Sequence, residues 1–186
     1  MLLSCKVQGR VAVSLAFCKP SSTITFMPVR TYEQNCSIAR TLQVVGERWT
    51  LLVLREVFTG QRRFEEIQRN LGVATNILSD RLQTLVDADI LERRPLGDRA
   101  DRFDYRLTEK GLDLNPVLLE LMRWGDRWDA PVAGPPKLVV HRDCGHETHA
   151  VQTCSHCGEP LTARNVRLHD GPGLTLATSG RRTATS

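Results

Sequence analysis

The chain has 186 residues, of which 41% are hydrophobic and 25% are charged, and its formal net charge is +4. This composition is ordinary for a soluble globular protein and fits one main domain with an appendage. The surplus of positive charge lies toward the two ends, because residues 27–130 hold about as many acidic as basic side chains. The composition excludes a bulk polycation, so any affinity for nucleic acid has to come from the local placement of arginines.

The first 26 residues combine basic side chains with a short apolar run at residues 11–17. A secretory signal requires an apolar region of about 7–15 residues followed by a small-residue cleavage site, and no such site follows this run. The chain also lacks any stretch of the roughly 20 apolar residues that cross a bilayer. We expect residues 1–35 to be a partly disordered extension, with Met27 as an alternative start, on a cytoplasmic protein that contacts no membrane.

Two helices are predicted next along the chain. Ile38, Leu42 and Val45 recur at the i, i+4 and i+7 positions of one helical face, and Gly46 ends the pattern. The segment between Gly46 and Gly60 is strongly apolar. It predicts a buried central helix.

Two shorter amphipathic segments follow, separated by about three residues around Gly72. Their apolar positions recur at helical spacing: Phe64, Ile67 and Leu71 in the first segment, and Leu78, Leu82 and Leu85 in the second. Two short helices joined by a tight turn with a glycine are typical of the helix-turn-helix motif.

Strand-like segments at residues 90–95 and 103–108 come next, with the turn-rich sequence LGDRAD between them. Thr108 is predicted to cap the start of one further helix. Asn115 as a cap, with Pro116 in the first turn, predicts the start of another helix, which carries Trp124 and Trp128. The proline-rich segment 130–136 then predicts a linker. A helix-turn-helix followed by a charged hairpin predicts a winged helix, so the fold class is mainly α with a small β-hairpin wing.

The run from Cys36 to about Ala133 resembles the HxlR family of bacterial winged-helix transcription regulators. Four features carry the resemblance: a cysteine that opens the first helix, Gly-x-x-Trp-Thr at residues 46–50, LSDRL at 78–82 and LTEKG at 107–111. The resemblance implies that residues 36–134 form a dimeric, sequence-specific DNA-binding domain that controls nearby genes.

The helix predicted after Gly72 has a polar face opposite its leucines. This face is the candidate base-reading surface, made of Thr75, Asn76, Ser79, Asp80 and Gln83. Asn and Gln side chains can form two hydrogen bonds with adenine, and Ser or Thr can contact base edges or phosphates. Asp80 is repelled by phosphates, so we expect it to accept from cytosine or to pair with an arginine. Arg81 falls beside the apolar face, which predicts a structural ion pair.

Arginines supply the candidate phosphate contacts. Arg99 and Arg102 are nearest to the tip of the predicted hairpin, and Arg62 and Arg63 precede the first helix of the motif. The alternative is that mixed charges only keep the hairpin soluble. Because the domain is nearly neutral, we expect modest non-specific affinity and a moderate dependence on salt.

The apolar surface of the first helix and of the helix with Trp124 and Trp128 exceeds what a small core can cover. This excess predicts a symmetric homodimer on double-stranded DNA, with a pseudo-palindromic operator whose half-sites lie about one helical turn apart. Repression is the expected mode of regulation, and activation is the alternative. A small-molecule or redox effector fits such a regulator.

Cys36 opens the first predicted helix, where the partial positive charge of the N-terminus lowers a thiol pKa. The family resemblance implies that some relatives use a cysteine at this position to sense oxidants or electrophiles. Cys36 is therefore a candidate redox sensor. The alternative is a small, half-buried residue at a dimer interface.

The segment HRDCGHETHAVQTCSHCG, residues 141–158, holds three of the six cysteines and four of the five histidines. It contains two half-sites at ligand spacing, each followed by a glycine: His141 with Cys144, and Cys154 with Cys157. This pattern predicts a small zinc ribbon over residues 135–170, with one structural zinc ion per chain. His146 and His149 are the alternatives to His141 as the fourth ligand.

An enzyme is not expected. A cysteine-rich zinc site is a weak Lewis acid, and the predicted ribbon is too short to enclose a substrate. The scattered remaining cysteines indicate no disulfide framework. Residues 171–186 are small and polar and predict a disordered tail. The main alternative function is a zinc-dependent, redox-responsive protein-interaction module on a winged-helix scaffold.

Overall fold

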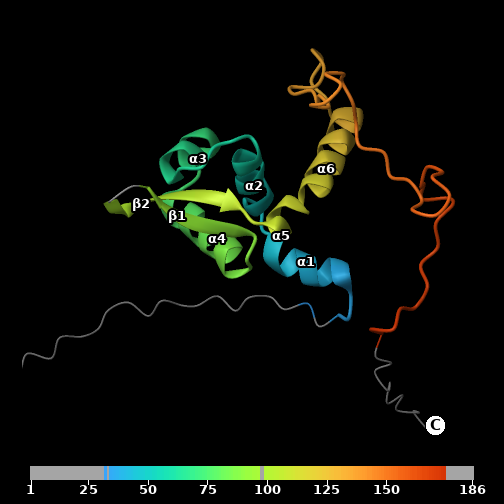
Figure 1. Cartoon of the computed structure of the whole chain (residues 1–186), viewed down its shortest axis with the longest axis horizontal. Coiled ribbons are helices and arrows are strands. Elements are labelled where there is room, and N and C mark those ends of the chain that lie inside the picture. The colour runs from blue at the N-terminus through green and yellow to red at the C-terminus, as the bar shows by residue number, and fades with distance from the viewer. Residues whose placement is uncertain (1–31, 33, 97–98, 175–186) are drawn as a thin grey trace, which may run out of the picture. The chain divides into compact units, whose positions relative to one another are not determined.

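The computed structural model describes Tyr32, residues 34–96 and residues 99–174, with the backbone alone for residues 99–101. The predictions for nearly all of the N-terminal extension and for most of the tail lie outside these residues. The described elements follow in chain order (Figure 1): α1 Ser37–Val45, α2 Thr50–Phe58, α3 Phe64–Leu71, α4 Thr75–Asp87, β1 Leu91–Leu96, β2 Arg99–Leu107, α5 Glu109–Leu112 and α6 Asn115–Trp128. The prediction of a mainly helical fold with one hairpin is confirmed.

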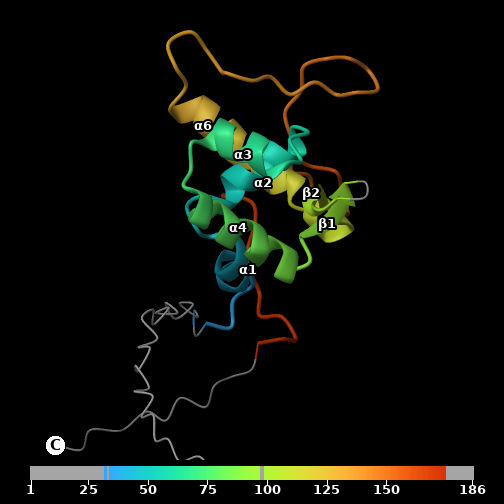
Figure 2. The ribbon, with the colours of Figure 1, turned by 90° about the vertical axis from the view of Figure 1, so that its left-hand side faces the viewer.

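Helix α2 lies at the centre of the core, as its composition predicts. Val53 and Leu54 are completely buried, and α2 packs against α3 and α4 (Figure 2). The other fully or nearly fully buried apolar side chains come from the neighbouring helices and the hairpin: Ile67, Leu78, Leu82, Leu85 and Leu91. Apolar burial of this kind is the main stabilising contribution to a small domain.

A buried carboxylate joins α2 to α3. Glu56 is 7% exposed. Its carboxylate accepts from Arg55 at 2.6 Å and from Nδ2 of Asn70 at 2.8 Å. A buried charge is tolerated when it is paired and hydrogen-bonded, so Asn70 fixes α3 against the central helix.

The hairpin is attached to the helices at its base. β1 and β2 pair antiparallel with Leu91 opposite Leu107, and Tyr105 is buried. The backbone N–H of Tyr105 donates to the carbonyl of Arg62 at 2.8 Å, which holds the start of α3 beside β2. β2 begins at Arg99, so the paired part of the hairpin extends further toward the tip than the predicted strand at residues 103–108.

The segment after the hairpin makes a close approach to the end of α4. The Thr108 hydroxyl caps α5 by accepting from the Gly111 N–H at 3.1 Å, as predicted. A Cβ at Gly111 would overlap the carbonyl oxygen of Ile90. Only glycine fits here without movement of the backbone. The LTEKG sequence therefore connects the wing to the core.

Helix α6 begins at Asn115 itself, with Leu114 as the residue before the first turn and no side-chain cap, so the predicted capping role of Asn115 is wrong by one position. Its first turn instead contains Pro116, which supplies a preset backbone angle without a cap. None of the residues of α6 is buried in the single chain. None of the helices that the structure describes has the length and apolar character needed to cross a membrane.

Candidate nucleic-acid interface

The turn between α3 and α4 has the geometry of a helix-turn-helix. Gly72 ends α3 in the left-handed region, with φ of 61°, and its N–H donates to the Gln68 carbonyl at 2.9 Å. Residues other than glycine rarely adopt this backbone conformation, which explains why a glycine ends the helix. The Gln68 side chain donates to Oγ1 of Thr75 at 2.8 Å and so connects the two helices.

Helix α4 has two distinct faces. Leu78, Leu82 and Leu85 are 0%, 1% and 0% exposed, which confirms the predicted inward face. The predicted base-reading side chains are all exposed: Thr75, Asn76, Ser79, Asp80 and Gln83. Because the buried leucines hold the helix firmly, the polar strip is presented on a rigid support.

The side chains of this strip differ in how they are engaged. Thr75 accepts from Gln68, and the Gln83 amide donates to Asp87 at 2.7 Å. The side chains of Asn76, Ser79 and Asp80 make no hydrogen bond or ion pair with any described residue. We call Asn76, Ser79 and Asp80 the free centre of the strip. Gln83 has to break its hydrogen bond to Asp87 before it can contact a base.

Arg81 lies beside the apolar face and is partly buried. Its guanidinium is 3.7 Å from the Glu47 carboxylate, which joins α4 to the turn between α1 and α2. The prediction of a structural ion pair is confirmed. Arg81 is therefore a structural residue and is not part of the exposed polar strip.

Four arginines were predicted to contact phosphates. Arg62, Arg63 and Arg102 are exposed, and no ion pair joins them to another described side chain. Arg99 lies at the start of β2, and its side chain is outside the described residues. The hydrogen bond between Tyr105 and Arg62 places the start of α3 next to the wing. The arginines of both segments can therefore bind phosphates along the same DNA strand.

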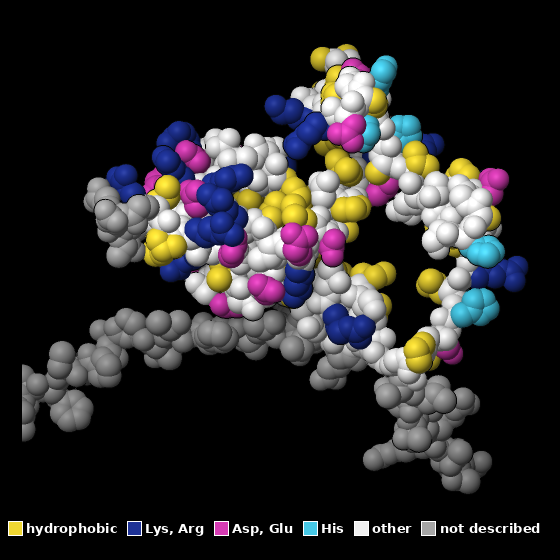
Figure 3. Space-filling view, in the orientation of Figure 1, with side chains coloured by type: hydrophobic (Ala, Val, Ile, Leu, Met, Phe, Trp, Pro, Cys, Tyr) yellow, Lys and Arg dark blue, Asp and Glu magenta, His cyan; other side chains and the backbone are white. Residues whose placement is uncertain are grey.

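The remaining wing arginines interact within the hairpin. The Arg93 guanidinium lies 4.3 Å from the Phe103 ring centre, Arg94 is 2.6 Å from Glu92, and Arg106 is 3.4 Å from Asp104. Figure 3 shows Lys and Arg side chains gathered over this part of the molecule, with Asp and Glu side chains among them. The wing is therefore a mixed surface, and part of its positive charge is already neutralised.

Large apolar side chains remain uncovered on α1 and α6. Ile38 is 70% exposed, and Trp124 and Trp128 are 64% and 66% exposed. Leu42, Val117 and Leu121 on the same two helices are also exposed. Several large exposed apolar side chains on two helices are typical of a protein–protein interface.

Cys36 is the residue that precedes the first turn of α1, and it is half-buried. The backbone N–H groups of Ala39 and Ile38 lower the pKa of its thiol, partial burial opposes them, and the Arg40 charge adds a smaller lowering effect. Hydrogen bonding and positive charge favour the thiolate, the reactive form of cysteine.

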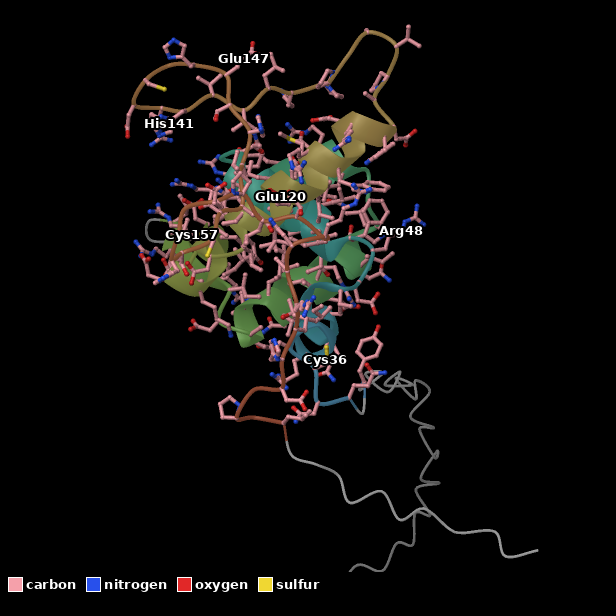
Figure 4. The ribbon with its side chains drawn as sticks, turned by 90° about the vertical axis from the view of Figure 1, so that its right-hand side faces the viewer. Cys36, Arg48, Glu120, His141, Glu147 and Cys157 are labelled. Atoms are coloured by element: carbon pink, nitrogen blue, oxygen red, sulfur yellow. The ribbon has the colours of Figure 1, made fainter. Side chains whose placement is uncertain are left out.

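The predicted zinc ligands come together in pairs. Nδ1 of His141 is 3.2 Å from Sγ of Cys144. The pKa of Cys154 is lowered by the backbone N–H groups of Cys157 and His156 and by the Cys157 side chain. The described residues contain no group of three or more potential metal ligands, and Figure 4 shows His141 and Cys157 in separate loops. Each half-site is formed, and the four-ligand site remains a prediction.

Sequence reasoning missed the side chain that sets the helix-turn-helix geometry. Gln68 lies at the flank of the apolar face of α3, four residues after Phe64, and donates across the turn to Thr75. The available signal is a polar residue at the edge of an apolar helical face just before a glycine turn. The contact of Tyr105 with Arg62 has no local signal, because it joins segments that are far apart in the chain.

Comparisons with known proteins agree with this geometry. The family described as HxlR-like helix-turn-helix matches residues 44–132. The HTH-type transcriptional regulator Rv3095 of Mycobacterium tuberculosis strain H37Rv is 47% identical over 138 residues, which cover 74% of this chain and 87% of that protein. The alignment is longer than the family match, so the likeness continues outside residues 44–132.

Two solved structures are similar over a comparable length. The crystal structure of PA1607, a candidate transcription factor, has a TM-score of 0.67 and 34% identity, and the match covers 75% of this chain and 97% of that one. The structure of PA1374 from Pseudomonas aeruginosa, another candidate transcription factor, has a TM-score of 0.54 and 34% identity, with 76% and 96% covered.

Proposed function

Because the chain belongs to the family of HxlR-like helix-turn-helix transcriptional regulators, we propose that it acts as a homodimeric repressor that reads a pseudo-palindromic operator with α4. The single observation that carries this proposal is the free centre of the polar strip on α4. Asn76, Ser79 and Asp80 are exposed and are engaged by no described residue, and the opposite face of their helix is fully buried. A rigid helix with unengaged polar side chains suits direct readout in a major groove.

Each side chain of the strip has a distinct role in this proposal. Asn76 forms two hydrogen bonds with an adenine, and Ser79 contacts a neighbouring base edge or phosphate. Asp80 accepts from the amino group of a cytosine, because a carboxylate is disfavoured near phosphates. Thr75, engaged by Gln68, contributes mainly to the orientation of the helix. Gln83 contacts DNA only after it leaves Asp87.

Arginines beside α4 hold the duplex in register. Arg62 and Arg63 bind phosphates at the start of α3, and Arg99 and Arg102 bind phosphates or the minor groove next to the wing. Since other wing arginines are paired with Glu92 and Asp104, the non-specific part of the affinity is moderate. Specificity then depends mostly on the strip.

The dimer is formed by the uncovered faces of α1 and α6. Pairing of these faces across a twofold axis buries Ile38, Trp124 and Trp128, which a single chain leaves exposed. A symmetric dimer presents two copies of α4 and therefore requires two inverted half-sites about one helical turn apart.

Cys36 makes this regulator responsive to oxidants or electrophiles. Its lowered pKa provides thiolate at the start of α1, the helix whose exposed face contributes to the proposed dimer surface. Modification there changes the packing of α1 and so the separation of the two recognition helices. We expect DNA binding of a Cys36→Ser variant to be unaffected by diamide and that of the parent protein to change.

Selection from a genomic fragment pool identifies the operator, and a mobility-shift assay then tests the strip. We expect Asn76→Ala to weaken specific binding by about 1–3 kcal/mol and to relax preference at one base position. Asn115→Ala is the matched control, because it makes the same change at an exposed position of α6. Equal binding by both variants, with no base preference lost, would contradict the proposal. Binding to protein targets instead of DNA would favour the interaction-module alternative.

A further inference from the structure

Two short turns in the C-terminal region have the same backbone structure. We call residues 139–148 the first knuckle and residues 152–161 the second knuckle. In the first, the Gly145 N–H donates to the His141 carbonyl at 2.8 Å. In the second, the Gly158 N–H donates to the Cys154 carbonyl at 2.9 Å. Both glycines are in the left-handed region, with φ of 71° and 76°.

The hydrogen bonds that flank each turn also correspond. The N–H of His141 donates to the His146 carbonyl at 2.9 Å, and the N–H of Cys154 donates to the Glu159 carbonyl at 2.8 Å. An outer pair follows in each: Thr148 N–H to Val139 at 2.9 Å, and Leu161 N–H to Gln152 at 2.8 Å. Each knuckle thus contains a single antiparallel bridge at its base.

This correspondence aligns the candidate ligands of the two knuckles. His141 matches Cys154, and Cys144 matches Cys157, with a spacing of 13 residues in both cases. By the same alignment His146 matches Glu159, and His149 matches a threonine. The correspondence therefore favours His141, the predicted fourth ligand, over its alternatives His146 and His149.

Side-chain geometry supports the same choice. Nδ1 of His141 faces Sγ of Cys144 at 3.2 Å, so both atoms are directed to one side of the first knuckle. The other ring nitrogen, Nε2, is 3.9 Å from the Asp143 carboxylate. A carboxylate next to the non-coordinating nitrogen is a common way of orienting a metal-bound imidazole.

The region that holds the knuckles has no apolar core. No residue from 131 to 174 is buried, and Val140 and Val151 are 53% and 59% exposed. Two ordered turns without buried apolar side chains need another source of stability. The cysteines of both knuckles are free thiols, so no disulfide supplies it. Metal binding is the usual alternative for a segment this small.

We propose that the two knuckles close on one zinc ion, held by the thiolates of Cys144, Cys154 and Cys157 and by Nδ1 of His141. Three sulfur atoms and one imidazole nitrogen form the closed tetrahedral set that is typical of structural zinc sites. Binding releases the thiol protons to solvent, and the imidazole binds in its neutral form. The nine residues between Cys144 and Cys154 allow the knuckles to approach each other.

Elemental analysis of the full chain, purified without chelators, tests the site. We expect about one zinc per chain in the parent protein, and well under one in a variant with Cys144→Ser and Cys157→Ser. Each knuckle loses one ligand in this variant, and neither loses its glycine. The measurement does not depend on DNA binding, so a failed metal site and a failed regulatory function are distinguishable.

Single variants test the assignment of the fourth ligand. His141→Ala should lower zinc retention during dialysis against a chelator, whereas His146→Ala and His149→Ala should retain zinc like the parent. His141→Cys should restore retention, and with Co²⁺ in place of zinc it should strengthen the sulfur-to-cobalt charge-transfer absorption. Zinc well below one per chain in the parent overturns the site. Loss of zinc from His146→Ala or His149→Ala, with retention by His141→Ala, overturns the ligand assignment.

Discussion

The winged helix and the two knuckles each contain a turn that ends in a glycine with positive φ, but the first turn lies beside a buried core and the others do not. Gly72 in the first region and Gly145 in the second both adopt a left-handed backbone after a short hydrogen-bonded turn. Around Gly72 the turn joins helices whose apolar faces are buried against α2. Around Gly145 no side chain is buried. A turn signal in the sequence therefore indicates local geometry, and the surrounding side chains determine what stabilises it.

Removal of a large apolar side chain tests this contrast with the largest expected effect. Leu82→Ala removes a side chain that is 1% exposed, and we expect the winged helix to lose about 2–5 kcal/mol of its free energy of unfolding. Leu161→Ala in the second knuckle, where the side chain is 40% exposed, should change it by less than about 0.5 kcal/mol. Urea denaturation of both variants measures the difference. Equal losses would show that the knuckles share the core.

Two glycine substitutions, one in the winged helix and one in the first knuckle, test the same contrast with a smaller expected effect. A Cβ in Gly111→Ala overlaps the Ile90 carbonyl and approaches the Leu107 side chain, so the backbone has to shift. We expect a loss of about 1–3 kcal/mol in the unfolding free energy of the winged helix. Gly145→Ala meets no atom but strains a positive φ, at about 1–2 kcal/mol.

Thermal unfolding and zinc titration together separate the two glycine variants. Gly111→Ala should lower the midpoint of the main transition and leave zinc affinity unchanged. Gly145→Ala should weaken zinc binding and leave that midpoint unchanged. The reverse pattern would contradict the division of the described chain into a core-stabilised and a metal-stabilised part.

The core also contains a polar atom whose removal should be favourable. The Thr50 hydroxyl is fully buried and has no hydrogen-bond partner among the described residues. Thr50→Val keeps the shape of the side chain and should raise the unfolding free energy by up to about 1 kcal/mol. Thr162→Val, at an exposed position of the C-terminal region, serves as the control and should leave the midpoint unchanged. A lower midpoint for Thr50→Val would indicate that this hydroxyl has a partner in solution.

Cys36 and the cysteines of the knuckles should also differ in their rates of alkylation. The pKa of Cys36 is lowered, so its thiolate fraction becomes significant at a lower pH than that of an ordinary cysteine. The rate of alkylation by iodoacetamide, followed peptide by peptide, should therefore rise at lower pH for Cys36 than for a free thiol. In zinc-loaded protein the cysteines of the knuckles should react slowly until a chelator is added. A pH profile for Cys36 that matches free cysteine would remove the basis for a sensor.

Sequence periodicity was sufficient for most of the winged helix. The leucines of α4 at i, i+4 and i+7 predict both its inward face and its exposed strip, because a helix that packs against a core has to segregate these side chains. The contact of Gln68 with Thr75 and that of Tyr105 with Arg62 were not predictable, since they depend on how distant segments pack. The single-turn helix α5 was only partly signalled, by its Thr108 cap.

The spacing of the candidate ligands was sufficient to predict the turn in each knuckle, but not to show that the two knuckles form one four-ligand site. His141 with Cys144, and Cys154 with Cys157, each form the expected turn because the two-residue spacing and the glycine are local properties. The proposed closure of the two turns is a non-local event, and because the region has no core we expect a shared ligand to drive it. The sequence favours His141 as the histidine ligand, and the backbone correspondence between the knuckles adds support to that proposal.

Hydroxyl-radical footprinting of the selected operator tests most directly whether two copies of α4 read DNA symmetrically. We expect two protected patches of equal extent, related by a twofold axis and about one helical turn apart, with Asn76→Ala weakening protection equally in both. A single patch, or protection that Asn76→Ala leaves unchanged at every position, would contradict recognition by the polar strip of α4 in a symmetric dimer.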